Sequence, residues 1–177
     1  MMQAAVRAFL WRGQSWAAFS YPALLAHLVV FGLGVLYGLN PENRAARGPH
    51  LPSLRENLIM MGLGGWLGAL AFAGVLRFLM TRDYRWDGQG RMLNLVAASW
   101  LIPMTLAAGL MAWGVAPMLT LPLWLYALAA CARAADRAMP EAGLPYCVGA
   151  VVASTIAGIA VWLVTVIGSW FLVYVLI

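Results

Sequence analysis

The stretch YRWDGQGRML, residues 84–93, has the glycines and charges of a loop that could hold a phosphate. A P-loop places a lysine after its last glycine and follows a strand, yet this chain contains no lysine. A dinucleotide-binding loop needs a third glycine after Gly88 and Gly90, but position 93 is Leu and begins an apolar run. The sequence therefore predicts a turn, in which the two glycines adopt positive φ angles and reverse the chain.

Four arginines surround this turn, and we expect them to contact anionic lipid. They are Arg77, Arg82, Arg85 and Arg91. Each arginine near an anionic leaflet contributes about 1 kcal/mol of attraction, offset in part by Asp83 and Asp87. Tyr84 and Trp86 are aromatic residues of the kind that anchors a protein at headgroup depth.

Two other polar residues lie within apolar runs. His27 has no carboxylate, cysteine or second histidine in a neighbouring run. A proton relay or metal site is one interpretation, but a neutral imidazole hydrogen-bonded to a neighbouring helix is favoured. Asn94 follows the turn, and we expect it to bond a carbonyl one helical turn back.

Sets of residues that carry out catalysis are absent from the sequence. There is no GxSxG or HExxH motif and no Ser-His-Asp set that could converge. Cys131 and Cys147 are not in CxxC spacing, so they indicate neither a disulfide framework nor a metal site. The sequence predicts a protein that is not an enzyme, without catalytic residues, cofactor or metal.

The composition is typical of a polytopic membrane protein. Hydrophobic residues make up 64% of the 177-residue chain, charged residues 10%, and the mean hydropathy is +0.84. The net charge is +5, but the arginines lie in short connections and form no continuous basic face. The expected partner is a membrane surface and not nucleic acid.

Five apolar runs approach the roughly 20 residues that cross about 30 Å of hydrocarbon. They are residues 21–39, 58–80, 93–113, 115–132 and 146–167. The third contains Pro103, where we expect a kink. The fourth is short and carries Pro117 and Pro122, so it either spans or re-enters. The apolar sequence after the fifth continues to the C-terminus, and we expect a break or an overhang near Gly168 and Ser169. The expected fold class is all-α, a five-span transmembrane bundle.

The segments outside these runs complete the predicted organisation. Residues 1–19 form either a short amphipathic segment that fits the headgroup layer or a frayed tail, and residues 20–177 form the transmembrane domain. The apolar and aromatic residues of the first segment are Val6, Phe9, Leu10, Trp16 and Phe19, with Arg7 and Arg12 between them. The connection between the first two runs contains three prolines and predicts an ordered or extended cap.

Arginine placement predicts the orientation. With five spans, eight arginines share the side of the N-terminus and three lie on the other side. The positive-inside rule puts the N-terminus in the cytoplasm and the C-terminus in the periplasm or exterior. Exclusive use of arginine, with abundant alanine and glycine, hints at a bacterial source, so the expected location is the bacterial inner membrane.

Small residues stand four apart in three of the runs. The pairs are Gly34 and Gly38, Gly64 and Gly68, and Ser154 and Gly158. Such pairs let helix backbones approach closely. We interpret them first as packing within the bundle and second as an interface of a homo-oligomer.

The order of these features resembles the bacterial branch of the Yip family, five-pass membrane proteins named for Ypt/Rab-interacting partners. The loop YRWDGQG precedes LNLVAASWLIP, a short proline-bearing run, a basic loop ending in GLPYCVGAVVASTIAGI, and a C-terminal span. The similarity covers roughly residues 58–167 and depends mostly on Trp86, Gly88, Pro103 and Tyr146.

The resemblance implies five helices with a cytoplasmic N-terminus. In eukaryotic members it also implies vesicle traffic and Rab GTPase binding through a long N-terminal region. Here that region has about twenty residues and lacks the acidic aromatic-glycine-proline motif, so Rab binding is not carried over. The family brings no catalytic residues.

The sequence thus predicts a non-enzymatic, multi-pass inner-membrane protein that organises membrane or protein partners. One alternative is a small transporter or channel-like oligomer built around Pro103, Asn94 and His27. Another is an accessory subunit of a larger membrane complex, in which many tryptophans fill lipid-facing grooves.

Overall fold

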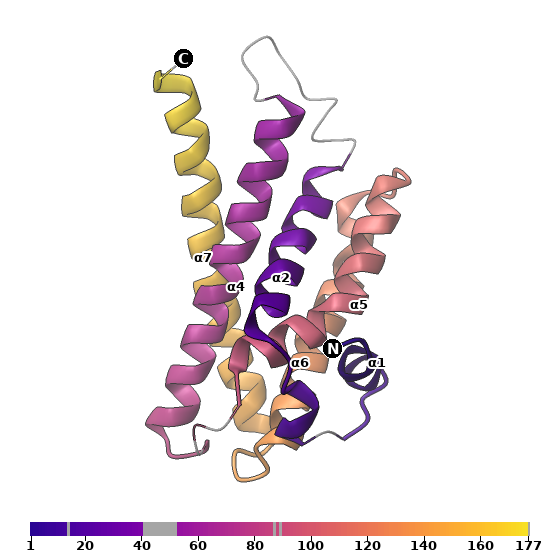
Figure 1. The fold of residues 1–177 in the computed structure, drawn as a ribbon, viewed down its shortest axis with the longest axis vertical. Coiled ribbons are helices and arrows are strands. Elements are labelled where there is room, and N and C mark those ends of the chain that lie inside the picture. Colours follow the sequence, from indigo (N-terminus) through magenta and orange to yellow (C-terminus); the bar gives the residue numbers. More distant parts are fainter. Residues whose placement is uncertain (14, 41–52, 87, 89, 177) are drawn as a thin grey trace.

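The computed structural model describes residues 1–13, 15–40, 53–86, 88 and 90–176, and every regular element in these ranges is helical. The elements, drawn in Figure 1, are α1 (Met2–Phe9), η1 (Trp16–Phe19), α2 (Ala23–Gly38), α4 (Leu54–Arg82), α5 (Met92–Ala112), η2 (Pro117–Thr120), α6 (Leu121–Ala138) and α7 (Leu144–Leu176). The all-α prediction is confirmed for the described part of the chain.

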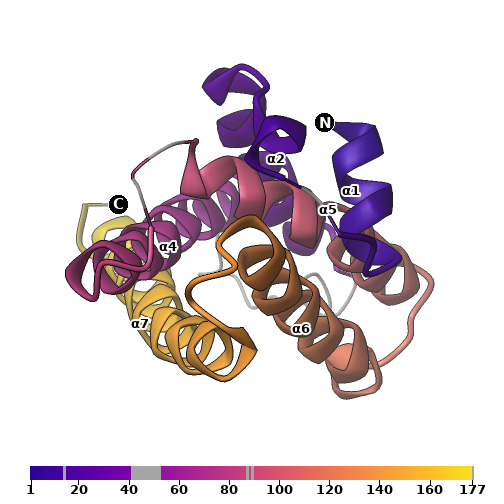
Figure 2. The same ribbon diagram turned by 90° about the horizontal axis from the view of Figure 1, so that it is seen from below.

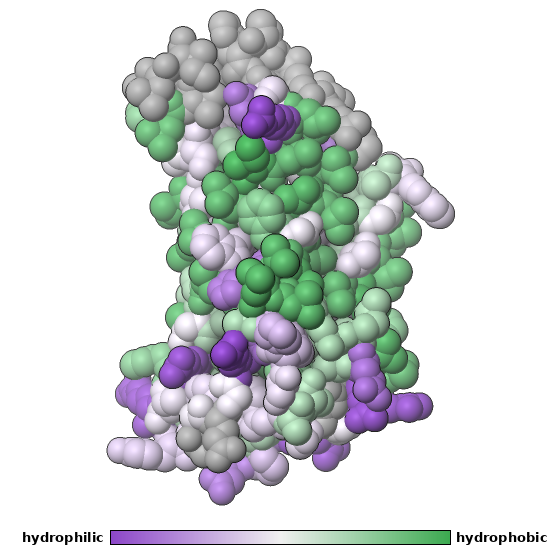
Figure 3. Space-filling model, in the orientation of Figure 1, coloured by the Kyte–Doolittle hydropathy of each residue, from purple (hydrophilic) through white to green (hydrophobic). Residues whose placement is uncertain are grey.

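Four segments are long and apolar enough to cross a membrane. They are α4, α5, the continuous unit Pro117–Ala138 and the Leu144–Leu172 part of α7. Figure 3 shows the corresponding apolar belt across the middle of the face in view. Helix α2 is apolar but has 16 residues, about 24 Å at 1.5 Å per residue. This is shorter than the hydrocarbon layer, so a fifth span over residues 21–39 stays a prediction.

The long helices and α2 form a ring, seen end-on in Figure 2. Helix α7 packs between α4 and α6, α5 packs between α6 and α2, and α2 returns to α4. Helix α1 lies against α5 and α6, with Ala4, Ala5 and Ala8 buried. The bundle therefore closes on itself, and the N-terminal segment packs against it.

Glycines bring α2, α4 and α7 into close contact. A Cβ added at Gly34 would fall against the Met61 carbonyl oxygen and 3.0 Å from the Gly62 Cα. Added at Gly68 it would lie 3.0 Å from the Gly158 carbonyl oxygen, and the converse holds at Gly158. These contacts confirm that the small residues at positions 34, 68 and 158 serve packing within the bundle.

Helix α4 begins at Leu54, before the predicted run 58–80, because Ser53 and Glu56 form a capping box that starts the helix. The prediction did not include this capping box. The Ser53 hydroxyl accepts from the Glu56 N–H at 3.3 Å, and a Glu56 carboxylate oxygen accepts from the Ser53 N–H at 2.6 Å. Residues 54–57 are therefore helical and not part of the predicted cap. The rest of that cap, residues 41–52, lies outside the described residues.

Helix α6 ends at Ala138, six residues beyond the predicted end of the fourth run. Alanine favours helix strongly, and Ala130, Ala134 and Ala135 are buried against the neighbouring elements. The charged residues Arg133 and Asp136 lie within this extension, where their side chains form an ion pair at 3.6 Å.

The third predicted run agrees with α5 within one residue at each end, and Pro103 lies inside the helix.

Helix α7 is continuous from Leu144 to Leu176, so the predicted break near Gly168 and Ser169 is wrong. Among the described residues outside its own helix turn, no atom lies within 4 Å of a Cβ built at Gly168. A single glycine weakens a helix by about 1 kcal/mol, which does not by itself interrupt the hydrogen bonds of the surrounding turns. The helix is about 50 Å long at 1.5 Å per residue, longer than the hydrocarbon layer, as the overhang alternative requires.

Candidate membrane-surface site

Helix α1, η1 and the α4–α5 and α6–α7 connections lie at one end of the bundle, opposite the C-terminus (Figure 1). We call this the arginine-rich end. Its sequence holds eight arginines, against four acidic residues. The arginines are Arg7, Arg12, Arg77, Arg82, Arg85, Arg91, Arg133 and Arg137. Figure 3 shows hydrophilic residues gathered below the apolar belt at this end.

The α4–α5 turn has the backbone that the sequence predicts. Gly88 and Gly90 have φ angles of +80° and +82°, a region that glycine adopts without steric cost. Gly90 is also required for space, because a Cβ there would lie 2.5 Å from the Trp16 ring. The turn is thereby pressed against η1.

Trp86 is buried within the protein, and its place at headgroup depth stays a prediction. Its side chain is 8% exposed. The Trp16 ring lies 5.5 Å away between centroids, and the Arg77 guanidinium lies 5.6 Å from the Trp86 ring. The reason is that η1 folds over the turn and covers the indole. Trp86 therefore links η1 to α4 within the protein.

Arg85 links the two connections at the arginine-rich end. Its Nη1 donates to the carbonyls of Glu141 at 3.0 Å and Ala142 at 3.2 Å. Its guanidinium carbon lies 4.7 Å above the Tyr146 ring, a cation–π contact. The side chain is half-buried, and its Nε has no hydrogen-bond partner among the described residues.

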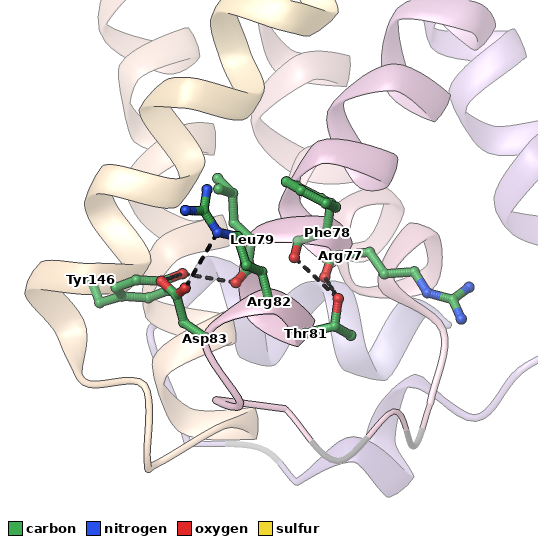
Figure 4. Close-up of polar contacts among 7 residues, drawn as sticks. All are labelled: Arg77, Phe78, Leu79, Thr81, Arg82, Asp83 and Tyr146. Carbon is green, nitrogen blue, oxygen red and sulfur yellow. Dashed lines mark hydrogen bonds and ion pairs between the residues drawn. The ribbon is translucent and has the colours of Figure 1, made fainter.

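Tyr146 connects α7 to the end of α4 (Figure 4). Its hydroxyl lies 2.8 Å from the Leu79 carbonyl oxygen and 2.7 Å from a carboxylate oxygen of Asp83. Arg82 approaches the other Asp83 oxygen at 4.0 Å, while the Arg77 guanidinium points away from this group (Figure 4). An exposed pair at that distance contributes about 0–1 kcal/mol, so Arg82 is held weakly.

The four predicted lipid-contacting arginines therefore have different environments. Arg77, Arg82 and Arg91 are exposed, whereas Arg85 is half-buried between protein carbonyls and an aromatic ring. Lipid contact at each of them stays a prediction. The three exposed arginines are placed to contact a surface outside the protein. Arg85 is a cation held in a fixed position within the protein.

His27 has the neighbour that the favoured interpretation requires. The Trp66 Nε1 lies 2.9 Å from His27 Nδ1. The indole N–H can only donate, so Nδ1 accepts this hydrogen bond. Within the described ranges, no group of three or more His, Cys, Asp or Glu residues is placed to hold a metal. His27 thus joins α2 to α4.

Asn94 bonds to a different segment from the one predicted. Its Nδ2 donates to the carbonyls of Phe19 at 2.7 Å and Tyr21 at 2.8 Å, and Tyr21 returns a hydrogen bond to the Asn94 carbonyl. The side chain is 1% exposed. The expected bond one turn back is wrong, because the irregular segment between η1 and α2 leaves carbonyls that have no helical partner.

Two hollows open at the arginine-rich end, and neither was predicted from the sequence. The smaller, about 160 Å³, is lined by Trp16, Arg85, Trp86, Ala138, Met139, Pro140 and Glu141. The larger, about 450 Å³, lies between α1 and η1, with Gln3, Arg7 and Ser15 among its lining residues. The smaller hollow combines residues from three separate segments, so no local motif could have revealed it.

The structure defines the class of the molecule as a helical, multi-pass membrane protein. This follows from its four membrane-length apolar helices. Comparison of the chain with protein-family models, curated proteins and solved structures found no match. The resemblance to the Yip family therefore stays a prediction.

Proposed function

We propose that this protein is a non-enzymatic inner-membrane protein that organises membrane or protein partners at its arginine-rich end. The observation that carries the proposal is the gathering of eight arginines at one end. Among the described residues only Arg82 and Arg133 are within 4.0 Å of a carboxylate. Most of this positive charge is available to an anionic leaflet or an acidic partner.

Helix α1 supports the proposal because it turns its larger side chains outward. The alanines at positions 4, 5 and 8 are buried, while Met2 and Val6 of the helix, and Leu10 and Trp11 directly after it, are exposed. Apolar side chains flanked by arginine suit the boundary between headgroups and acyl chains. In this arrangement α1 contacts the bundle and the membrane surface together.

The proposal includes an orientation and a topology. The arginine-rich end faces the cytoplasm by the positive-inside rule, and the C-terminus lies on the periplasmic side. Helix α2 would complete a five-pass arrangement, as in the bacterial Yip proteins that the sequence resembles.

Lipid preference tests the proposal. The full chain is reconstituted in phosphatidylcholine vesicles, and energy transfer from its tryptophans to dansyl-labelled phosphatidylglycerol or phosphatidylcholine is compared. We expect stronger transfer to phosphatidylglycerol, reduced when Arg77, Arg82 and Arg91 are all replaced by Gln. Arg55→Gln is the matched control, since Arg55 begins α4 at the opposite end.

Equal transfer to both lipids, together with no protein partner on crosslinking in native membranes, would count against the proposal. A solute flux through these vesicles that His27→Ala abolishes would support a transporter instead.

A further inference from the structure

The smaller hollow at the arginine-rich end places a cation beside two indole rings. Its volume of about 160 Å³ exceeds that of several water molecules at about 30 Å³ each. Arg85 lies in its wall with Trp16 and Trp86, and Met139 and Glu141 complete the side formed by the α6–α7 connection. A wall of this kind suits a ligand with a charged group and an apolar portion.

The charge of Arg85 is not neutralised within the described part of the chain. Carbonyl oxygens of Glu141 and Ala142 accept from Nη1, but no described carboxylate lies within 4.0 Å of the guanidinium. A half-buried cation that lacks an anion has lost hydration without full compensation. An anion entering the hollow would supply it.

Arg85 is also held in place before any ligand arrives. Two hydrogen bonds fix Nη1 and the Tyr146 ring supports the guanidinium plane at 4.7 Å. Trp86 is held between Trp16 and Arg77, at 5.5 Å and 5.6 Å. A preformed wall reduces the entropy lost on binding, and Arg77 adds positive charge behind it.

We propose that this hollow binds the phosphate of a glycerophospholipid, with Arg85 as its cation and the Trp16 and Trp86 rings against its glycerol and upper acyl carbons. A planar guanidinium recognises phosphate well. The hollow opens where the membrane-length helices α4, α6 and α7 end, which favours a lipid over free phosphate. This inference rests on the proposed function and names one ligand of the same end.

The binding test uses the full chain in a neutral detergent and native mass spectrometry. The probes are dioctanoyl phosphatidylglycerol, inorganic phosphate and dioctanoylglycerol, which lacks the phosphate. We expect saturable binding of one phosphatidylglycerol, with at least about tenfold weaker binding of the other two probes, because each lacks one of the two contacts.

Variants locate the site. Arg85→Gln should weaken phosphatidylglycerol binding at least about tenfold, whereas the matched control Arg91→Gln, exposed at the same end, should change it less than about twofold. Ala138→Leu fills the hollow while retaining Arg85, and should weaken binding similarly. Glu141→Gln removes a negative charge from the wall and should strengthen binding, which keeps the test decisive if the first variants fail to fold.

The outcomes separate the possible errors. Phosphate binding as tightly as the lipid would overturn the lipid assignment. Equal losses in Arg85→Gln and Arg91→Gln would show general surface attraction and overturn the site. Weaker binding by Glu141→Gln would also overturn the site, because removal of a negative charge from its wall must favour an anionic ligand. In those cases, a preference for phosphatidylglycerol in the energy-transfer assay would leave the proposed function standing. Loss of that preference would remove the proposed function as well.

Discussion

At the residue scale, glycine contacts set how closely the helices approach. A Cβ at Gly34 would meet the backbone of α4, which cannot rotate away as a side chain could. We predict that Gly34→Ala lowers the free energy of unfolding by about 1–3 kcal/mol, measured by denaturation in detergent. Gly32→Ala is the control in the same helix, because a Cβ there has no described atom of another helix within 4 Å. A similar loss in both variants would refute the close approach.

Asn94 is the second residue whose contacts make a sharp prediction. Asn94→Ala leaves the Phe19 and Tyr21 carbonyls without their amide donor, and we expect a loss of about 1–3 kcal/mol in unfolding free energy. Thr105→Ala, an exposed residue bonded only to Leu101 in its own helix, should stay within about 0.5 kcal/mol. Unchanged stability in Asn94→Ala would contradict the assigned bonds.

The contacts of some of these residues could be predicted from the sequence, and those of others could not. The spacing of Gly68 and of Gly158 within their helices indicated close packing, because small-residue pairs at four-residue spacing are a local signal. The partners of Asn94 and Arg85 lie 73 and 56 residues or more away. No local pattern connects such segments, so these contacts required the structure.

At the element scale, α7 tests how a glycine acts inside a long helix. Because α7 continues through Gly168, Gly168→Ala should raise helix stability by about 0.5–1 kcal/mol, detected as a higher melting temperature by circular dichroism. Gly149→Ala, also without a neighbour within 4 Å, should behave alike, whereas Gly158→Ala should destabilise. A lower melting temperature for Gly168→Ala would instead support the predicted break of the helix near Gly168.

The start of α4 provides a second test at this scale. Ser53→Ala removes the cap and should cost about 1 kcal/mol in unfolding stability. Glu56→Gln retains the reciprocal hydrogen bond of a capping box and should cost less. Equal effects of the two substitutions would mean that the carboxylate charge matters as much as the cap.

Helix positions were predictable and several helix ends were not. The apolar runs predicted the positions of the membrane-length helices, because the thickness of the hydrocarbon layer sets the length of a spanning helix. The S-L-R-E sequence at residues 53–56 was a readable signal of a helix start. The extension of α6 to Ala138 was harder to foresee, since it depends on alanines packed against neighbouring elements.

At the scale of the whole molecule, the proposed orientation depends on the difference in positive charge between the two ends of the bundle. The α4–α5 turn lies at the arginine-rich end, and the α5–α6 connection lies at the other end of α5 (Figure 1). If α5 crosses the membrane, these connections face opposite compartments. The positive-inside rule then places the arginine-rich end in the cytoplasm.

Labelling of introduced cysteines tests that orientation most directly. Thr81→Cys and Trp113→Cys are made in turn at exposed positions, Trp113 being 89% exposed, while Cys131 and Cys147 are buried and should stay unlabelled. A membrane-impermeant maleimide added to intact cells should label Trp113→Cys, and should label Thr81→Cys only after permeabilisation. Labelling of both positions from outside, or of Thr81→Cys alone, would contradict an arginine-rich cytoplasmic end.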